Sequence, residues 1–237
     1  MGLSRHRGEV GGRALVLQTR SVQNEIVPSL VIFGVAGQLG SRVAVEAISR
    51  HNEVTGAARR LDRQSLPRGV TPATGDATSP ESVRALAPGV DVIVMAVGGA
   101  DKTVYLRAAR AAVQALSDMG NAPRIIHSGG GGSLLNPEGV RFVDTPDFPA
   151  QLREEVLGQA AALDFYRNSH GVTWTYMSPP PGGFAPGERL GHYRSGTDWP
   201  VVDEEGNARI SYEDYAMALV DEIDSPSHLN ARFTVGY

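Results

Sequence analysis

Three evenly spaced glycines, Gly34, Gly37 and Gly40, form the clearest chemical pattern in this chain of 237 residues. They follow an apolar run at 30–33 and open a segment of helical character. Between a strand and a helix, such glycines permit a tight turn, close approach of the backbone to a diphosphate, and close packing of the helix on the strand. The positive end of the helix near Gln38 would face the phosphates. The pattern therefore predicts a dinucleotide site, although a turn that needs glycines only for its geometry would look the same.

Two arginines at the end of the next predicted strand indicate which dinucleotide would bind. In this kind of fold an acidic residue about 20 positions after the glycines holds a ribose 2′-hydroxyl, whereas an arginine accommodates a 2′-phosphate. Here Arg59 and Arg60 occupy that place, and no carboxylate follows until Asp62. A guanidinium matches phosphate geometry and keeps its charge. We therefore predict NADP(H) in preference to NAD(H), with ordinary surface arginines as the alternative.

The elements that must position these residues alternate between strand and helix signals. This alternation predicts an α/β fold, a Rossmann-like doubly wound parallel sheet with a small C-terminal elaboration. Strands are expected at 30–33, 53–57, 70–74, 91–97, 124–127, 173–177 and 232–235. Helices are expected at about 38–50, from Pro80, at 103–119, at 150–168 and after Ser211, with Ser79 and Ser211 as N-caps and Gly120 as a stop. A glycine- and proline-rich loop at 182–191 should precede a hairpin.

Length and composition restrict the remaining possibilities. Residues 29–237 are expected to form a single domain, and 1–28 a loosely ordered N-terminal extension, either a leader or an arm that contacts a partner.

The net charge of −4 comes without a basic stripe, which disfavours nucleic acid as a partner. The chain has no cysteine, which rules out disulfides and thiolate metal sites, and no His, Asp and Glu cluster predicts a metal. No apolar run could span a membrane. We expect a soluble cytoplasmic protein with a small-molecule substrate, and a homodimer remains open.

Further ligand contacts are expected at the carboxyl ends of the parallel strands, where ligands sit in open α/β sheets. Asp76 and Ala77 should lie near the adenine, and the segment at 97–98 beneath the ribose and pyrophosphate. Ser128 and the segment at 178–179 should flank the nicotinamide. The complete predicted cofactor site consists of Gly34, Ala36, Gly37, Gln38, Leu39, Gly40, Arg59, Arg60, Asp76, Ala77, Val97, Gly98, Ser178 and Pro179.

Several segments together resemble atypical short-chain dehydrogenase/reductases. More narrowly, the chain resembles the NmrA-like NAD(P)-binding group whose members are often described as NADH-flavin reductases, with biliverdin reductase B as a more distant relative. The resemblance covers about residues 29–237 and implies the fold and the cofactor more strongly than the reaction, because such folds host many activities. The segments that carry it are the glycine turn, Arg59, 75–77, 174–179, 186–189, 210–216 and 233–237.

The chain departs from the wider superfamily at the catalytic residues. Ordinary members use a Tyr-x-x-x-Lys pair in which the lysine lowers the pKa of a proton-donating tyrosine. The only lysine here is Lys102, and no tyrosine lies four residues before it. By the resemblance, Gln159 stands where biliverdin reductase B-like proteins have a histidine. The resemblance therefore implies an oxidoreductase without the Tyr-x-x-x-Lys pair.

The chemistry of hydride transfer narrows the range of possible hydride acceptors. An isolated ketone would become a strongly basic alkoxide and needs a good acid, whereas a flavin, quinone or conjugated enone leaves a delocalised anion that solvent can protonate. Ser128 is the hydroxyl best placed to polarise an acceptor carbonyl, and Gln159 could assist through its amide. Local backbone bonding by Ser128 and a surface location for Gln159 are the alternatives. His127 is expected to be a packed histidine, whereas His192 could reach the site from the loop that precedes it.

Three functions fit these residues. The leading hypothesis is an NADPH-dependent reductase that transfers hydride to a flavin, quinone or conjugated carbonyl. The second is a redox-neutral biosynthetic enzyme of the same fold, such as an isomerase, dehydratase or cyclase. The third is a non-catalytic regulator that senses NAD(P). Lack of a Gly-x-Ser-x-Gly elbow disfavours acyl transfer.

Overall fold

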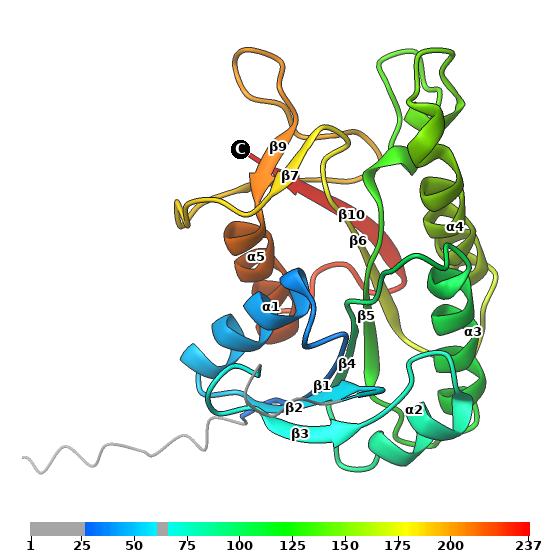
Figure 1. Cartoon of the computed structure of the whole chain (residues 1–237), viewed down its shortest axis with the longest axis vertical. Helices are drawn as coiled ribbons and strands as arrows, with labels where there is room; N and C mark the ends of the chain where they lie inside the picture. Colours follow the sequence, from blue (N-terminus) through cyan, green and yellow to red (C-terminus); the bar gives the residue numbers. More distant parts are fainter. Residues whose placement is uncertain (1–26, 61–65) are drawn as a thin grey trace, which may run out of the picture.

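The computed structural model describes residues 27–60 and 66–237, which form a central sheet covered by helices on both faces (Figure 1). The strands of this sheet are β1 (Ser29–Phe33), β2 (Glu53–Ala58), β3 (Thr71–Thr74), β4 (Val92–Met95), β5 (Arg124–Ser128), β6 (Trp174–Ser178), β8 (Arg194–Gly196) and β10 (Ala231–Gly236). Their order is β3-β2-β1-β4-β5-β6-β10-β8. All neighbours are parallel except β8, which runs antiparallel to β10.

The strand order confirms the predicted fold class. The chain starts at the centre of the sheet with β1, builds outward to β3, and returns across the centre to β4, which is the arrangement of a doubly wound Rossmann-like sheet. Ligands bind in such sheets where the order reverses, at the carboxyl ends of β1 and β4. The division into an N-terminal extension and a single domain stays a prediction, because residues 1–26 lie outside the described part of the chain.

One face of the sheet is covered by three consecutive helices and the other by two helices from distant parts of the chain. The helices are α1 (Gln38–Ser49), α2 (Pro80–Leu86), α3 (Val104–Leu116), α4 (Ala150–Arg167) and α5 (Tyr212–Asp224), with single 3₁₀ turns at Gly131–Ser133 and Phe142–Asp144. α2, α3 and α4 pack on one face and α1 with α5 on the other (Figure 1). Within the described residues no helix combines the length and apolar character needed to cross a membrane.

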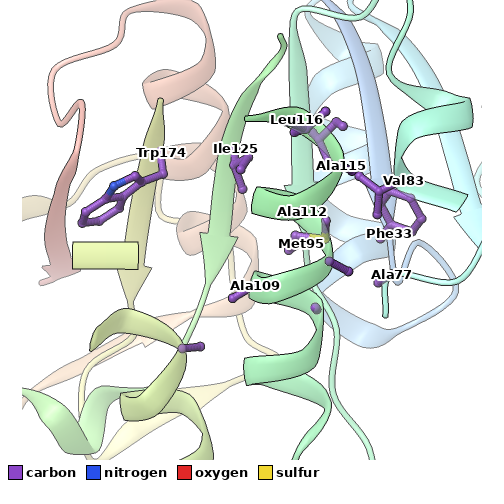
Figure 2. Packing of buried hydrophobic residues seen from close by; sticks show 14 of the residues in the cluster. Phe33, Ala77, Val83, Met95, Ala109, Ala112, Ala115, Leu116, Ile125 and Trp174 are labelled. Carbon is purple, nitrogen blue, oxygen red and sulfur yellow. The ribbon is translucent and has the colours of Figure 1, made fainter. Parts of the chain in front are cut away.

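The core under α3 shows why this helix lies close to the sheet. Ala109, Ala112 and Ala115 belong to the same buried cluster as Met95 and Ile125 (Figure 2). Alanine side chains are short, so they let the helix backbone approach the strands while still excluding water. β4 is buried along its whole length, as expected for a parallel strand covered on both faces.

The predicted N-caps are confirmed. The Ser79 hydroxyl oxygen accepts from the backbone N–H of Ser82 at 3.1 Å, and the Ser211 hydroxyl oxygen from that of Asp214 at 3.0 Å. Such caps satisfy backbone donors that the first helical turn leaves free.

Two local expectations were wrong. α3 ends at Leu116 and not near Gly120, because Ser117 and Asp118 are poor helix formers and the Asp118 carboxylate pairs with Arg84 of α2. The predicted hairpin after the 182–191 loop is not formed. Instead β7 (Gly183–Ala185) pairs in parallel with β9 (Arg209–Ser211), and β8 covers the edge of β10. Local turn signals did not reveal these long-range pairings, one of which protects an otherwise open sheet edge.

A buried carboxylate joins the 182–191 loop and the last residue of the chain to the start of α5. Asp214 is fully buried and accepts from the backbone N–H groups of Leu190 and Gly191, at 2.8 and 2.9 Å, and from the Tyr237 hydroxyl at 2.6 Å. Burial alone would raise the pKa of Asp214, but the bonds from Tyr237, Gly191, Leu190 and Ser211 outweigh it and lower the pKa below its ordinary value.

We predict that Asp214→Asn weakens the fold in a pH-dependent way. A carboxylate with a lowered pKa in the folded state contributes stability above its ordinary pKa of 3.8, and this contribution is lost as the pH falls through the folded value. The variant should therefore be less stable than the parent by about 2 kcal/mol at neutral pH, and the difference should shrink towards pH 3. Urea unfolding at several pH values measures this. Asp164→Asn on the exposed side of α4 is the control, and parallel pH profiles for D214N and its parent would contradict the prediction.

Candidate cofactor site

The glycine turn brings three backbone segments into direct contact. Gly34 has a φ of +86°, and a Cβ there would lie 2.2 Å from the carbonyl oxygen of Ala96. A Cβ on Gly40 would lie 2.2 Å from the carbonyl oxygen of Gly34. Neither position accepts a side chain without moving backbone, so the first and third glycines are required by the packing of β1, β4 and α1.

Gly37 has a different role. A Cβ there would meet only the carbonyl oxygen of Gly34, at 3.1 Å, and otherwise point into the cavity that Gly37 lines. No side chain caps the N-terminus of α1 at this residue. The free amides of the first turn and the positive helix end are thus open to a ligand. This cradle, which a Cβ would fill, fits the diphosphate of a dinucleotide cofactor.

One cavity of about 850 Å³ runs along the carboxyl ends of β1 to β4. Eight of the predicted cofactor residues line it: Gly34, Gly37, Arg59, Arg60, Asp76, Ala77, Val97 and Gly98. Of the other predicted contacts, Ala36 lies in the turn, and Gln38, Leu39 and Gly40 form the start of α1. The structure therefore brings together the residues expected around the adenosine and the diphosphate.

The charges around the cavity favour an anionic ligand beside an ordered carboxylate. Arg59 and Arg60 are exposed at the end of β2. The Asp76 carboxylate accepts from the backbone N–H and the hydroxyl of Thr78, at 2.9 and 2.8 Å. Burial would raise the pKa of Asp76, but these bonds and the nearby charges of Arg59 and Arg107 lower it. Asp76 therefore remains ionised at neutral pH.

Sequence reasoning missed Arg107 of α3, which also lines the cavity. Its guanidinium donates to the Thr78 hydroxyl oxygen at 2.9 Å and to the Asp101 carboxylate at 3.0 Å. It thus connects the loop after β3 with the loop after β4. Nothing in the local sequence distinguishes Arg107 from the other arginines, since only the fold places it here.

The residues predicted beside the nicotinamide lie further along the same edge, outside the 850 Å³ cavity. Ser128 is the last residue of β5 and is buried. Ser178 ends β6, fully buried, and its hydroxyl has no hydrogen-bond partner among the described residues. A Cβ on Gly131 would lie 2.4 Å from the carbonyl oxygen of Pro179, so the 129–132 glycine run lies directly on the segment after β6. Contact of these residues with a cofactor stays a prediction.

Gln159 is part of a polar cluster that the sequence did not reveal. A Cβ on Gly130 would lie 1.7 Å from Oε1 of Gln159, so the side chain lies against the glycine run, half-buried and not free on the surface. Next to it, the Glu155 carboxylate accepts from the Tyr105 hydroxyl and from Nζ of Lys102, each at 2.6 Å.

This cluster does not reproduce a lysine-activated tyrosine. Burial and the Glu155 carboxylate raise the pKa of the Tyr105 hydroxyl, which makes it a weaker acid. Burial would raise the pKa of Glu155, but the bonds from Lys102 and Tyr105 lower it. Lys102 also donates to the carbonyl oxygen of Gly99 at 3.2 Å, at the rim of the cavity. The arrangement therefore holds α4 against the loop after β4.

The two histidines considered from the sequence are not placed for acid–base work. His127 is fully buried, and its Nδ1 lies 3.1 Å from the Tyr166 hydroxyl. Burial lowers the pKa of His127 to about 3, so the ring stays neutral at physiological pH. His192 is exposed, with its ring 5.8 Å from that of Tyr237, and does not line the cavity.

Known proteins are similar to this chain, some in sequence and some in structure. Over 214 residues the chain is 32% identical to the uncharacterised protein YwnB of Bacillus subtilis (strain 168). The alignment covers 86% of this chain and 96% of that protein. A crystal structure of a candidate exported protein from Burkholderia pseudomallei superposes with a TM-score of 0.80 at 33% identity, over 89% of this chain and 100% of that one.

Two further crystal structures are named for enzymes. One is a candidate NADH-flavin reductase, SP1627 of Streptococcus pneumoniae TIGR4, with a TM-score of 0.79 and 28% identity over 88% of this chain and 99% of that one. The other is a candidate epimerase from Bacteroides thetaiotaomicron, with a TM-score of 0.78 and 31% identity over 89% and 97% of the two chains.

A family match agrees with the cavity and with these relatives. Residues 34–226 match the NAD(P)H-binding family, and this range begins at the first glycine of the turn and ends after α5. The expected nicotinamide cofactor is thereby confirmed, as is the similarity to the atypical short-chain dehydrogenase/reductases of the NmrA-like group. The chain belongs to the NAD(P)H-binding family.

Proposed function

We propose that the protein is an NADPH-dependent reductase that transfers hydride to a flavin, a quinone or a conjugated carbonyl. The observation that carries the proposal is the cavity along β1 to β4, with an open glycine cradle at its inner end and Arg59 and Arg60 at its rim. A bound reduced nicotinamide would supply the hydride. The residues of the chain would hold the diphosphate on the α1 amides and pair a 2′-phosphate with the guanidinium groups.

The side chains beyond the cavity support an acceptor that needs no strong acid. The Tyr105 hydroxyl donates to Glu155, and burial together with that carboxylate raises its pKa. His127 stays neutral inside the core. A reduced flavin, quinone or enone spreads its negative charge over a conjugated system and can take its proton from water. For such acceptors the protein would act mainly by holding the two reacting groups in line.

A redox-neutral reaction is the second candidate, and one relative favours it. The candidate epimerase from Bacteroides thetaiotaomicron is 31% identical and nearly as similar in structure as the candidate NADH-flavin reductase. In an epimerase of this fold, a nicotinamide cofactor could serve as a transient hydride store.

A turnover assay distinguishes the two candidates. We expect NADPH to be consumed when the protein is mixed with FMN, FAD, menadione or a small enone. The loss of absorbance of the reduced nicotinamide measures this consumption. The reductase proposal fails if NADPH binds tightly and none of these acceptors is reduced, and a redox-neutral reaction then becomes the better explanation.

We predict that the arginines after β2 select NADPH. The double variant R59A/R60A should bind NADPH roughly 10- to 150-fold more weakly, because loss of one charged hydrogen bond to the 2′-phosphate costs about 1.5–3 kcal/mol, while its affinity for NADH should hardly change. Titration calorimetry with both cofactors measures this. Arg68→Ala removes an exposed arginine outside the cavity and is the control. The prediction is wrong if the parent protein prefers NADH, or if the double variant loses equal affinity for both cofactors.

We predict that Gly37→Val abolishes binding of either cofactor and leaves the fold intact. The new side chain would fill the diphosphate cradle, yet it meets no protein atom closer than 3.1 Å at its Cβ. The melting temperature should change by only a few degrees. Gly120→Val, at an exposed glycine with no atom within 4 Å of a Cβ, is the matched control. Retained NADPH affinity in G37V would show that no diphosphate lies against this turn.

A further inference from the structure

The Ser128 hydroxyl is held by a buried tyrosine from the other end of the chain. Its Oγ lies 3.1 Å from the hydroxyl oxygen of Tyr215 on α5. That tyrosine hydroxyl in turn lies 2.7 Å from the carbonyl oxygen of Met177 on β6. Tyr215 is fully buried, and its ring lies 4.8 Å from that of Phe184, so its orientation is fixed by packing.

The direction of these two hydrogen bonds follows from counting hydrogens. A phenol has one hydrogen to donate, and a carbonyl oxygen can only accept. The bond to Met177 therefore uses the Tyr215 hydrogen, and Ser128 must donate its own hydrogen to the Tyr215 oxygen. Burial raises the pKa of the Tyr215 hydroxyl, so the proton stays on the phenol oxygen. Ser128 is left with its oxygen lone pairs for any further partner.

Ser128 lies outside the cavity but on the same carboxyl edge of the sheet. Met95 of β4 pairs with His127 of β5, so the next residues, Ala96 and Ser128, follow side by side at the carboxyl edge. Ala96 lines the cavity and contacts the first glycine of the turn. Ser128 is thus one strand beyond β4 and two strands from β1, which the diphosphate cradle follows, in the direction in which the nicotinamide half of a dinucleotide would extend.

We infer that Tyr215 is a positioning residue that fixes Ser128 as a hydrogen-bond acceptor, so that Ser128 binds an N–H or O–H group on the nicotinamide half of the cofactor. The inference rests on the proposed function and refines it. It also reverses the role expected from the sequence, in which Ser128 would donate to the carbonyl of the hydride acceptor. The carboxamide N–H₂ and the ribose hydroxyls are the donors that this half of the cofactor presents.

Three variants test the assignment by calorimetry with NADPH and with 2′,5′-ADP, which carries only the adenosine half. Ser128→Ala and Tyr215→Phe should each weaken NADPH binding about three- to tenfold, the size expected for one hydrogen bond. The double variant S128A/Y215F should bind NADPH about as S128A does, because Tyr215 acts through Ser128. Affinity for 2′,5′-ADP should not change in any of them.

Tyr215→Phe is suited to this test because the fold should tolerate it. The Met177 carbonyl oxygen keeps its bond from the backbone N–H of Gly129 at 2.9 Å. Tyr193→Phe, which removes a hydroxyl bonded to Asp221 at 2.8 Å, is the control for loss of a tyrosine hydroxyl, and melting temperatures are compared for all variants.

Other outcomes overturn the assignment. NADPH affinity that is unchanged or improved in Y215F would mean that Ser128 does not act as a held acceptor. Equal losses for NADPH and 2′,5′-ADP would mean that Tyr215 supports the fold in general. If the unsubstituted protein binds neither ligand, the proposed function itself fails. If it binds both and Y215F behaves like the parent, only the present inference fails.

Discussion

The contact between the backbone of Gly34 and two other segments is the constraint on which the site depends. Its carbonyl oxygen lies 2.2 Å from the place of a Cβ on Gly40, and a Cβ on Gly34 itself would lie 2.2 Å from the carbonyl oxygen of Ala96. Because no side chain separates them, β1, β4 and the start of α1 meet directly. The same contact therefore sets the inner end of the cavity and aims the free amides of α1 at it. Gly37 completes the arrangement by leaving that space open.

The charge of the site is a local property that the composition hides. The chain as a whole is acidic, with a net charge of −4. Three arginines nevertheless line one cavity, and the two carboxylates there, Asp76 and Asp101, are held by hydrogen bonds from threonines of their own loops. Ordered in this way, the carboxylates fix the loops, and Asp101 also pairs with Arg107, while Arg59 and Arg60 are exposed at the rim. An anionic ligand is favoured here despite the overall charge.

Features formed by residues close together in the sequence could be predicted from it, and contacts between residues far apart in the sequence could not. The glycine turn, the serine caps and the alternation of strands and helices are local, and each was found from the sequence. The bonds of Glu155 to Tyr105 and of Ser128 to Tyr215 join residues 50 and 87 positions apart, and no local pattern announces them. The β7–β9 pairing was missed for the same reason, because a strand's partner depends on which edges the finished fold leaves open.

The hydrogen bonds at the far end of the site also limit the chemistry it can perform. The Ser128 hydrogen is committed to Tyr215, the Tyr105 hydrogen to Glu155, and His127 is neutral within the core. Proton donation by any of these groups would first require an existing bond to break inside or beside the core, where an unpaired polar group is costly. Use of these groups to orient the reactants carries no such cost at the moment of reaction, because the fold has already fixed their positions. These constraints agree with the proposed reductase reaction, in which the electron pair would arrive in a conjugated system and the proton would follow from solvent.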